Sequence, residues 1–360
     1  MTDWIEAPLV DTVTRLDEVS LAERKTILAG AKDKAAHRAH FDRLPALRQV
    51  EIGGTASRRT AIDGPARIAC WNVERLRHLD AVEATLRAAA IDVALLSEVD
   101  RGMARSGNRD CIAELAGRLG HGYLYAVEYL ELDLGDVDEK RTHAGETNFV
   151  GFHGAAISSD VALARPFLIR LEAHGDWFDG TRHEPRVGGT IALGAIVQVA
   201  DVPVVMVSVH LESYCTPATR RDDIAQLLTL IDRIDSTAPV ILGGDFNTST
   251  ASHTERADRD AWRTRLAAEP GRLIRPEPYE PLFELLAANG YDWHACNVAD
   301  IPTTRYTDPN RPRAKLDWFF TRGLVASAPE IIPALRPDGT PSSDHDCLMV
   351  TIAPRQRRAR

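Results

Sequence analysis

Several short apolar stretches of this chain border polar side chains of the kinds that bind metal ions and phosphate. The most distinctive is GGDFN (residues 243–247), which follows the apolar run 238–242. Two glycines tolerate the backbone angles of a tight turn, and the turn then presents an aspartate and an asparagine two residues apart. A turn that only faced solvent would explain the glycines and the asparagine, but it explains Asp245 less well. We therefore expect Asp245 and Asn247 to lie in a site formed with other strand ends.

Five other apolar stretches border polar residues in the same way. One carboxylate or histidine at a strand end is most often a solvated or structural residue, but six such places in one chain are hard to explain by solvation alone. The further candidates are Asn72 and Glu74 in CWNVE, Glu98 in LLSEVD, His210 in VSVHLES, Asp317 in KLDWFF, and Asp344 and His345 in SSDHD.

The oxygen-bearing candidates suit a hard divalent cation. Glu98, together with Asn72 and Asp344, offers carboxylate and amide oxygens, which Mg²⁺ and Mn²⁺ prefer. Such a metal ion offsets the negative charge of a phosphoester during hydrolysis. We expect a Mg²⁺ or Mn²⁺ site at these residues.

The remaining candidates suit attack by water on phosphorus. Asn247 and His210 can hold a phosphate without adding negative charge. His345, oriented by a carboxylate, is a suitable general base for water. The chain has no GxSxG motif and no reactive-cysteine setting that would indicate a protein nucleophile. These residue types predict a phosphoester hydrolase.

The surrounding sequence predicts strands and helices that mix along most of the chain. Residues 79–90 have helical composition, residues 217–235 show an apolar stripe behind a Thr216 cap, and LFELLAANG (282–290) is a further helix. The two apolar runs on either side of residues 200–203 predict a hairpin. Hairpins that alternate with single helices indicate two mostly antiparallel sheets packed face to face, with helices outside.

Turn signals divide the chain into two parts. Residues 1–52 predict a helical extension packed on or tethered to the core, in which Ser20 and Glu23 fit a capping box. Glycines 53–54 and the stretch 62–67 mark its boundary, and residues 62–356 form the predicted catalytic domain. The stretch after GGDFN, up to about residue 280, is polar and rich in arginine and proline. ATRRDDIAQ (218–226) predicts a solvated helix face, with Arg220 as a possible brace of the cleft.

Bulk composition is that of an ordinary globular protein. The 360 residues are 44% hydrophobic and 26% charged, and no apolar run is long enough to span a bilayer. The first residues do not resemble a signal peptide, and the five cysteines are scattered, as free thiols in a reducing cytosol would be. We therefore expect a cytoplasmic protein. The formal net charge of −9 opposes non-specific binding to nucleic acid.

The motifs WNVERL, LLSEV, SVHLES, GGDFNT, KLDWFF and SSDHDCL, in this order, resemble the endonuclease/exonuclease/phosphatase superfamily. That superfamily includes DNase I-like nucleases, abasic-site endonucleases, deadenylases, neutral sphingomyelinases and inositol-polyphosphate phosphatases. The resemblance extends from about residue 67 to residue 354. It implies a four-layer α/β sandwich and a divalent metal ion.

The resemblance also implies roles for the candidate residues. Glu98 matches the principal metal ligand, and Asn72 and Asp344 match metal-site residues, while Glu74 falls where some members keep an acidic residue. His210 matches the histidine that contacts the scissile phosphate or assists the leaving group. Asp245 and Asn247 match the pair that positions phosphate and water. His345 matches the final histidine, and Asp317 matches the carboxylate paired with it.

Two segments are candidates for substrate binding. The end of 128–154 carries Asn148 and His153, which we expect at the cleft mouth, although an exposed acidic loop is the alternative for this segment. The segment 303–320 carries Arg305 and Arg313 together with Arg311, Lys315 and Tyr306. These cations can meet substrate phosphate, or they can form a solvated basic loop.

Three functions remain open on the sequence alone. The first is a phosphodiesterase acting on nucleic acid, which we narrowly prefer. The second is a hydrolase of a small or lipid-derived phosphoester, which suits the acidic chain and could use Trp177 and Phe178 as an apolar lip, unless they form a packed loop. The third is a catalytically silent scaffold, which the complete set of competent side chains opposes. The sequence indicates no obligate protein partner.

Overall fold

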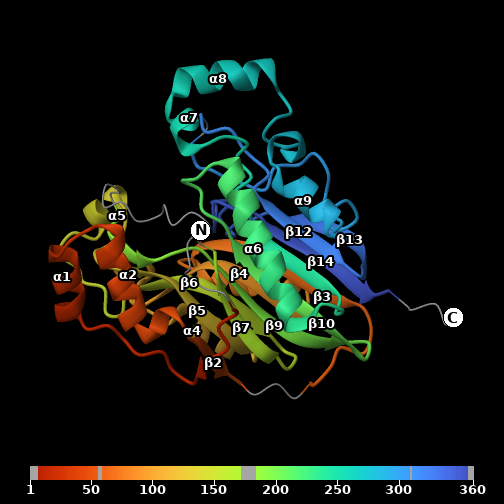
Figure 1. The fold of residues 1–360 in the computed structure, drawn as a ribbon, viewed down its shortest axis with the longest axis horizontal. Coiled ribbons are helices and arrows are strands. Elements are labelled where there is room, and N and C mark those ends of the chain that lie inside the picture. Colours follow the sequence, from red (N-terminus) through yellow and green to blue (C-terminus); the bar gives the residue numbers. More distant parts are fainter. Residues whose placement is uncertain (1–6, 56–58, 172–183, 309, 356–360) are drawn as a thin grey trace.

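The fold is a sandwich of two sheets covered by helices on both outer faces (Figure 1). It is seen in a computed structural model that describes residues 7–55, 59–171, 184–308 and 310–355. Trp177 and Phe178 lie outside these residues. The predicted four-layer α/β sandwich is confirmed. Among the described residues, no helix is both long and apolar enough to cross a membrane.

The larger sheet has nine strands within the described residues. Their order is β1-β2-β5-β6-β4-β3-β14-β13, and β8 pairs with β5. The strands β3 and β4 at its centre are parallel, and most of their neighbours are antiparallel. The bounds are β1 Thr12–Val13, β2 Val50–Gly54, β3 Ala66–Arg75, β4 Val93–Arg101, β5 Gly122–Glu131, β6 Phe152–Ser159, β8 Arg186–Gly188, β13 Leu324–Ile332 and β14 Cys347–Pro354.

The smaller sheet has the order β12-β11-β10-β9-β7. It contains the predicted hairpin, since β9 and β10 pair antiparallel on either side of residues 200–201. Its central pair, β10 and β11, is parallel. The bounds are β7 Ala164–Arg170, β9 Ile191–Val199, β10 Val202–His210, β11 Val240–Asp245 and β12 Asp317–Arg322.

Side chains alternate between the two faces of each sheet, and this alternation builds the three apolar layers. In β3, Ile68 and Cys70 enter the core between the sheets, whereas Ala69 and Trp71 face the helices outside. Because the central strands bury both faces, they are apolar almost throughout, and polar residues occur mainly where the strands end.

Helices cover the outer face of each sheet. Residues of α1 to α4 share a core with the nine-stranded sheet, and α6 and α9 pack on the five-stranded sheet. The predicted helices are confirmed in α3, α6 and α9, and Thr216 caps α6 as expected. The bounds are α1 Leu21–Ala29, α2 Lys34–Arg43, η1 Pro45–Leu47, α3 Leu79–Ala88, η2 Ala104–Ser106, α4 Cys111–Leu119, α5 Val137–Thr142, α6 Pro217–Asp235, α7 His253–Ala257, α8 Arg259–Ala268, η3 Glu277–Tyr279 and α9 Leu282–Ala288.

The N-terminal extension carries α1 and α2. Ser20 accepts a hydrogen bond from the Glu23 amide as predicted, but the Glu23 carboxylate pairs with Arg43 and does not complete the capping box. The extension does not end at the glycines 53–54, however, because these belong to β2 and pair with β5. Gly53 is required there by the Tyr123 ring, which lies 2.3 Å from where a Cβ would be. The glycines thus allow close packing within the sheet and do not mark a break in the chain.

The arginine- and proline-rich stretch up to about residue 280, for which no element was predicted, contains helices. This stretch forms α7 and α8, which stand beyond the ends of the sheets (Figure 1), and the short η3. Ser252 and Glu255 make a capping box at α7, and Asp258 caps α8. The apolar periodicity is weak because only Trp262 of α8 is buried, whereas the caps were visible in the sequence.

Candidate active site

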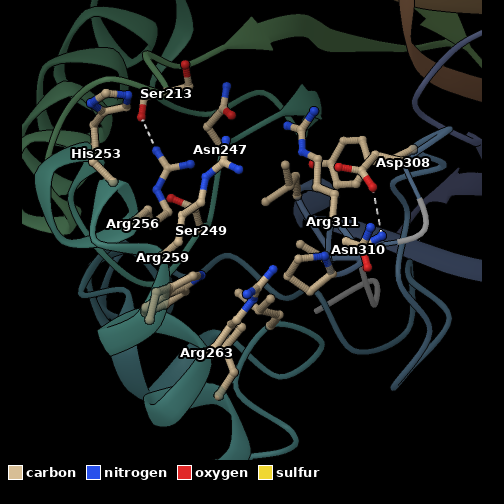
Figure 2. Close-up of a pocket in the computed structure, with 18 of the residues that line it drawn as sticks. Ser213, Asn247, Ser249, His253, Arg256, Arg259, Arg263, Asp308, Asn310 and Arg311 are labelled. Carbon is tan, nitrogen blue, oxygen red and sulfur yellow. Dashed lines mark hydrogen bonds between the residues drawn. The ribbon is translucent and has the colours of Figure 1, made fainter.

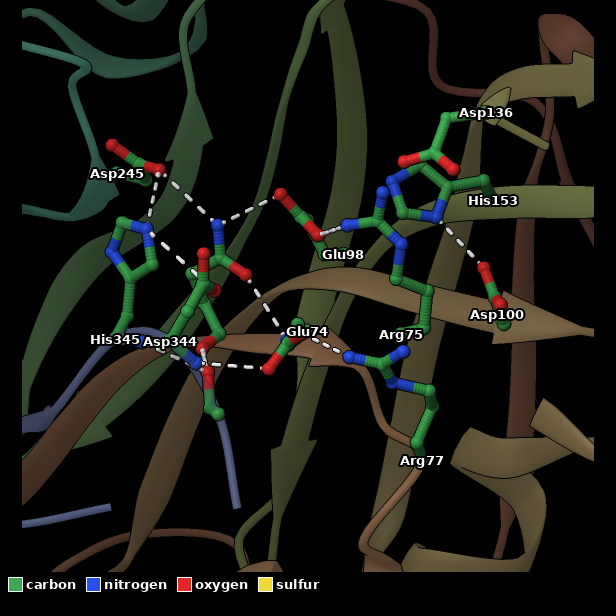
Figure 3. A network of polar contacts seen from close by, with 12 residues as sticks. Glu74, Arg75, Arg77, Glu98, Asp100, Asp136, His153, Asp245, Asp344 and His345 are labelled. Atoms are coloured by element: carbon green, nitrogen blue, oxygen red, sulfur yellow. Dashed lines mark hydrogen bonds and ion pairs between the residues drawn. The ribbon is translucent and has the colours of Figure 1, made fainter. Parts of the chain in front are cut away.

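The predicted catalytic and metal-site residues meet at one edge of the sandwich (Figure 3). The strands β3 and β4 are parallel neighbours in one sheet, as are β10 and β11 in the other, so their carboxyl ends lie on the same side. Within the smaller sheet, His210, Asp245 and Asp317 are in register on three neighbouring strands. Asn72 and Glu98 approach this row from the larger sheet.

The backbone at the strand ends explains the glycines of GGDFN. Gly244 has a φ of 149°, and a Cβ there would lie 2.0 Å from the Val209 carbonyl oxygen of the neighbouring strand. Asn247 and Glu98 also adopt positive φ, at 48° and 56°. Such angles are uncommon outside glycine and tend to occur at functional sites. Asp245 and Asn247 leave the end of β11 in this way, whereas Glu98, predicted at a strand end, lies inside β4 where the pairing with β6 shifts register between Leu96 and Val99.

Asn72 connects the two sheets. Its Nδ2 donates to Glu98 Oε1 at 3.0 Å and to Asp245 Oδ2 at 3.2 Å, while its Oδ1 accepts from the Glu74 amide at 3.1 Å. The expected metal-site asparagine is therefore a donor that bridges two carboxylates. This arrangement fixes the separation of Glu98 from Asp245.

Three carboxylates on the larger sheet form an acidic cluster. The Asp344 amide donates to Glu74 Oε2 at 2.9 Å, which brings the loop before β14 to the end of β3. Burial, and then the charges of Asp344 and Glu98, raise the pKa of Glu74. A divalent cation bound by these carboxylates would relieve this repulsion.

Arg75 is a residue of this cluster that the sequence did not indicate. Its guanidinium forms an ion pair with Glu98 Oε2, and its Nε lies 3.2 Å from Glu139 Oε1. Burial opposes ionisation of Glu98, but Arg75, the two histidines His153 and His210, and the hydrogen bond from Asn72 together hold the pKa of that carboxyl well below its usual value. Arginine is common beside carboxylates, and nothing local in VERL identifies its partner.

His345 and Asp317 form the predicted pair. His345 Nδ1 lies 2.8 Å from Asp317 Oδ2, which also accepts from Thr303 Oγ1 at 2.6 Å. His345 Nε2 lies 3.7 Å from Asp245 Oδ2. Although burial disfavours the imidazolium, Asp317 and Asp245 raise the pKa of His345 well above its usual value.

Asp245, Asp317 and His345 have donor atoms within 4.8 Å of one another, close enough to share a metal ion. Asp317 Oδ2 is engaged by His345 and Thr303, whereas its Oδ1 is buried and has no hydrogen-bond partner among the described residues. We call Asp245, Asp317 and His345 the acid–base cluster.

His210 has a buried partner that the sequence did not reveal. Its Nδ1 lies 2.9 Å from Glu128 Oε2, and its Nε2 faces Asp245 Oδ2 at 4.0 Å. Burial lowers the pKa of His210, but Glu128 more than compensates and raises it to about 10. Glu128 opened the segment that we expected to be a loop, but residues 128–131 belong to β5.

The two residues expected at the cleft mouth are buried, although His153 lies near enough to Glu98 that its charge lowers the pKa of that carboxyl (Figure 3). Asn148 accepts from the Ala104 amide and donates to the Asp133 carbonyl oxygen, each at 2.8 Å, so its amide ties two loops together. His153 lies on β6, with Nδ1 2.8 Å from Asp100 Oδ1. Both side chains are under 5% exposed. The exposed-loop alternative also fails at the end of 128–154, because residues 152–154 belong to β6.

The basic segment before β12 is mostly tied to the protein itself. Arg305 and Arg313 both bind Asp346, at 2.6 Å and 3.1 Å. Lys315 Nζ donates to the Val298 carbonyl oxygen at 2.6 Å, and burial lowers its pKa to about 8. Arg311 differs, because it stacks on Tyr306 at 3.4 Å and lines a pocket beside the site.

Arg220 is fully buried, so the predicted solvated helix face is wrong at this position. Its guanidinium binds both oxygens of Glu280, at 2.6 Å and 3.1 Å. Glu280 Oε1 in turn accepts from the Thr250 amide at 2.7 Å. The pair therefore fastens α6 to the loop that follows Asn247, which corresponds to a bracing role.

Comparisons with known proteins agree with this geometry. A model of the endonuclease/exonuclease/phosphatase family matches residues 69–345. The search of curated proteins returned no match.

Solved structures of low identity share the fold. An endonuclease/exonuclease/phosphatase from Beutenbergia cavernae has a TM-score of 0.55 at 18% identity, over 81% of this chain and 72% of that one. The human nocturnin catalytic domain, solved with a bound sulfate anion, has a TM-score of 0.53 at 16% identity, over 86% of this chain and 98% of that one. A Bacteroides vulgatus member has a TM-score of 0.51 at 16% identity, over 81% and 99%. The chain belongs to the endonuclease/exonuclease/phosphatase family, whose members are generally phosphoester hydrolases.

Proposed function

We propose that this protein is a divalent-metal-dependent phosphodiester hydrolase in which water attacks phosphorus, with nuclease activity preferred. The observation that carries the proposal is the position of Asp245. Its Oδ2 accepts from Asn72 at 3.2 Å and faces both His345 Nε2, at 3.7 Å, and His210 Nε2, at 4.0 Å. One carboxylate thus joins the expected metal site to two histidines.

The expected cofactor is Mg²⁺ or Mn²⁺, held by Glu98 and Asp344. When bound, such a cation supplies charge neutralisation at the phosphate oxygens. Asn72 contributes by holding Glu98 and Asp245 apart at a fixed distance. Arg75 must share Glu98 with the cation or move away from it.

In this proposal Asp245 accepts the proton of the attacking water, and His345, whose raised pKa favours the imidazolium form, places positive charge beside it. Asp317 holds Nδ1 of His345, which leaves Nε2 directed at the space beside Asp245. Burial raises the pKa of Asp245 to about 6, even though His345 opposes the rise. A pKa near the working pH suits a group that takes up a proton during turnover.

His210 supplies positive charge to the phosphate or to the leaving oxygen. With a pKa of about 10 it remains protonated near neutral pH, and Glu128 keeps Nδ1 engaged so that Nε2 faces the site. Asn247 donates through Nδ2 to the Leu211 carbonyl oxygen at 2.7 Å and retains a second amide hydrogen for substrate. Neither residue adds negative charge to the site.

A second candidate function is hydrolysis of a small or lipid-derived phosphoester. The formal net charge of −9 favours it, because extended nucleic-acid surfaces are usually basic. A scaffold without activity is disfavoured. Burying the polar residues of the site costs desolvation free energy, and a protein that needed only a packed core would not require that cost.

The test is a substrate panel assayed with EDTA, Mg²⁺ or Mn²⁺. It includes bis-(p-nitrophenyl) phosphate, supercoiled plasmid, single-stranded oligonucleotides and a phosphomonoester, with Glu98→Gln and His345→Ala as active-site variants. Arg38→Ala, an exposed change in α2, is the matched control. We expect metal-dependent cleavage of oligonucleotide or plasmid that both active-site variants lose. Cleavage of the small ester alone would favour the second function, and no turnover with any metal would contradict the proposal.

A further inference from the structure

A pocket of about 640 Å³ opens beside the candidate active site (Figure 2). Its walls come from α7, α8 and the segment 306–316. Asn247 and Leu316 also line it, and these residues lie two positions from Asp245 and one position from Asp317. The pocket therefore begins where the acid–base cluster ends.

Arginine side chains dominate the polar lining of this pocket. Arg256, Arg259 and Arg263 come from α7 and α8, and Arg311 comes from the facing segment. Among the residues that the structure describes, Arg256, Arg259 and Arg311 have no carboxylate within 4.0 Å. Arg263 has only the exposed Asp260, at 3.9 Å.

Acidic groups are scarce in the same lining. Asp308 is the one carboxylate among its described residues, and its Oδ1 accepts from the Asn310 amide at 2.8 Å. Burial, and then the charges of Arg220 and Arg311, lower the pKa of Arg256. Cations thus repel one another in a chain whose net charge is −9. An anionic ligand would remove that repulsion.

Aromatic surfaces lie among these arginines. Tyr306 lies under the Arg311 guanidinium at 3.4 Å, the rings of Tyr214 and His253 pack at 4.1 Å, and Trp262 lies in the wall. A guanidinium stacked on a ring is held in place and still directs its N–H groups to a ligand. Bases of single-stranded nucleic acid stack on such aromatic and arginine surfaces.

The chain path connects the pocket to the active site. The Arg305 amide donates to the Asp344 carbonyl oxygen at 2.6 Å, and Thr304 forms an antiparallel β-bridge with His345. Tyr306 follows directly and forms part of the pocket wall. A substrate whose scissile phosphate lies at His345 and Asp245 can therefore continue into the pocket.

We propose that this pocket binds the nucleotide unit next to the scissile phosphate, with the arginines on its phosphate and the aromatic rings against its base. The inference rests on the proposed phosphodiesterase function and names the substrate class for it. The nucleotide unit could belong to a single strand or to a small nucleotide. Both present the same phosphate and base to the pocket.

The test compares two double variants that change the net charge equally. Arg259→Ser/Arg263→Ser removes two pocket arginines. Arg265→Ser/Arg275→Ser removes two exposed arginines nearby, one on α8 itself, that do not line the pocket. Thermal unfolding of both variants checks that α8 remains folded.

Binding is measured by fluorescence anisotropy with the full chain in Mg²⁺ and a labelled phosphorothioate hexanucleotide that resists hydrolysis. We expect the pocket variant to bind about tenfold more weakly, and its salt dependence to fall by about 1.4 in log–log slope for two lost contacts to a single strand. The control variant should stay within about twofold of the wild type. Equal losses in both variants, no loss in the pocket variant, or no binding by the wild type would each overturn the inference.

Two further arms separate the ligand sources and the two proposals. Competition by ADP at an affinity equal to that of the hexanucleotide assigns the pocket to a small nucleotide, whereas weak competition assigns it to a strand. In the kinetic arm, the ratio of kcat/KM for an oligonucleotide to that for bis-(p-nitrophenyl) phosphate should fall in the pocket variant about tenfold more than in the control. If the wild type hydrolyses no diester but binding still depends on Arg259 and Arg263, the proposed function fails and the nucleotide site stands.

Discussion

His37 makes the docking of the N-terminal extension sensitive to acid. It lies in α2, it is 1% exposed, and its Nε2 accepts the Gly188 amide of β8 at 3.2 Å. Burial, and then the charge of Arg170, lower the pKa of His37 from 6.5 to about 3. The folded protein therefore keeps this imidazole neutral at a pH where the unfolded chain protonates it.

The sign and size of the effect follow from proton linkage. A lowered histidine pKa means that the unfolded chain binds the extra proton, so stability is complete above a pH of about 6.5 and falls as the pH approaches about 3. At a pH of about 5, protonation of His37 in the unfolded chain lowers the free energy of unfolding by about 2 kcal/mol.

The perturbation is His37→Gln, which keeps an acceptor for the Gly188 amide and removes the titrating group. The free energy of unfolding in urea is measured for the wild type and the variant at a pH of about 7.5 and about 5. We expect the wild type to lose about 2 kcal/mol more than the variant between these conditions. Other histidines titrate in both proteins and cancel in the difference. An equal loss in both proteins would refute the reasoning and would mean that α2 is not docked on β8 in solution.

Three further predictions concern the active site and its surroundings. Glu98→Gln should weaken Mg²⁺ binding about tenfold or more in isothermal titration calorimetry, because it replaces the principal charged ligand; unchanged affinity would remove Glu98 from the metal site. Asp317→Asn should lower kcat by about 10²-fold to 10⁴-fold without shifting the thermal unfolding midpoint by more than a few degrees, because His345 loses its orienting carboxylate; normal turnover would exclude the pair. Asn148→Ala should lower the free energy of unfolding in urea by about 1–3 kcal/mol, because the Ala104 amide and the Asp133 carbonyl lose a buried partner. It should leave KM unchanged, and a raised KM would restore Asn148 to the substrate site.

The strand ends could be predicted because each is a local signal. A strand buried on both faces is apolar until it leaves the sheet, so a carboxylate at its end is conspicuous in the sequence. His210, Asp245 and Asp317 were found in this way, and the register of β10, β11 and β12 places them side by side. The same reasoning located the helices α3, α6 and α9.

The partners of these residues could not be predicted from local patterns. Glu128 lies 82 positions before His210, and the link depends on the approach of β5 to the other sheet. Arg305 and Arg313 stood beside the motif and looked available to substrate, yet Asp346 holds both. Sequence spacing indicates which charges are present, but only the fold decides which of them are already paired.

Net charge is a poor guide to substrate in this protein because the charges are unevenly distributed. Carboxylates gather where a cation is expected, around Glu98 and Asp344, and they repel a phosphoester until a cation is bound. Arginines gather on the other side of Asn247, in the pocket formed by α7 and α8, and among the described residues only Arg263 of these has a carboxylate within 4.0 Å. A substrate of alternating phosphate and base would be attracted to the pocket first and held for the metal-dependent step. The formal charge of −9 therefore weighs against an extended nucleic-acid surface but not against a nucleotide unit bound in a pocket whose charged lining is mostly arginine.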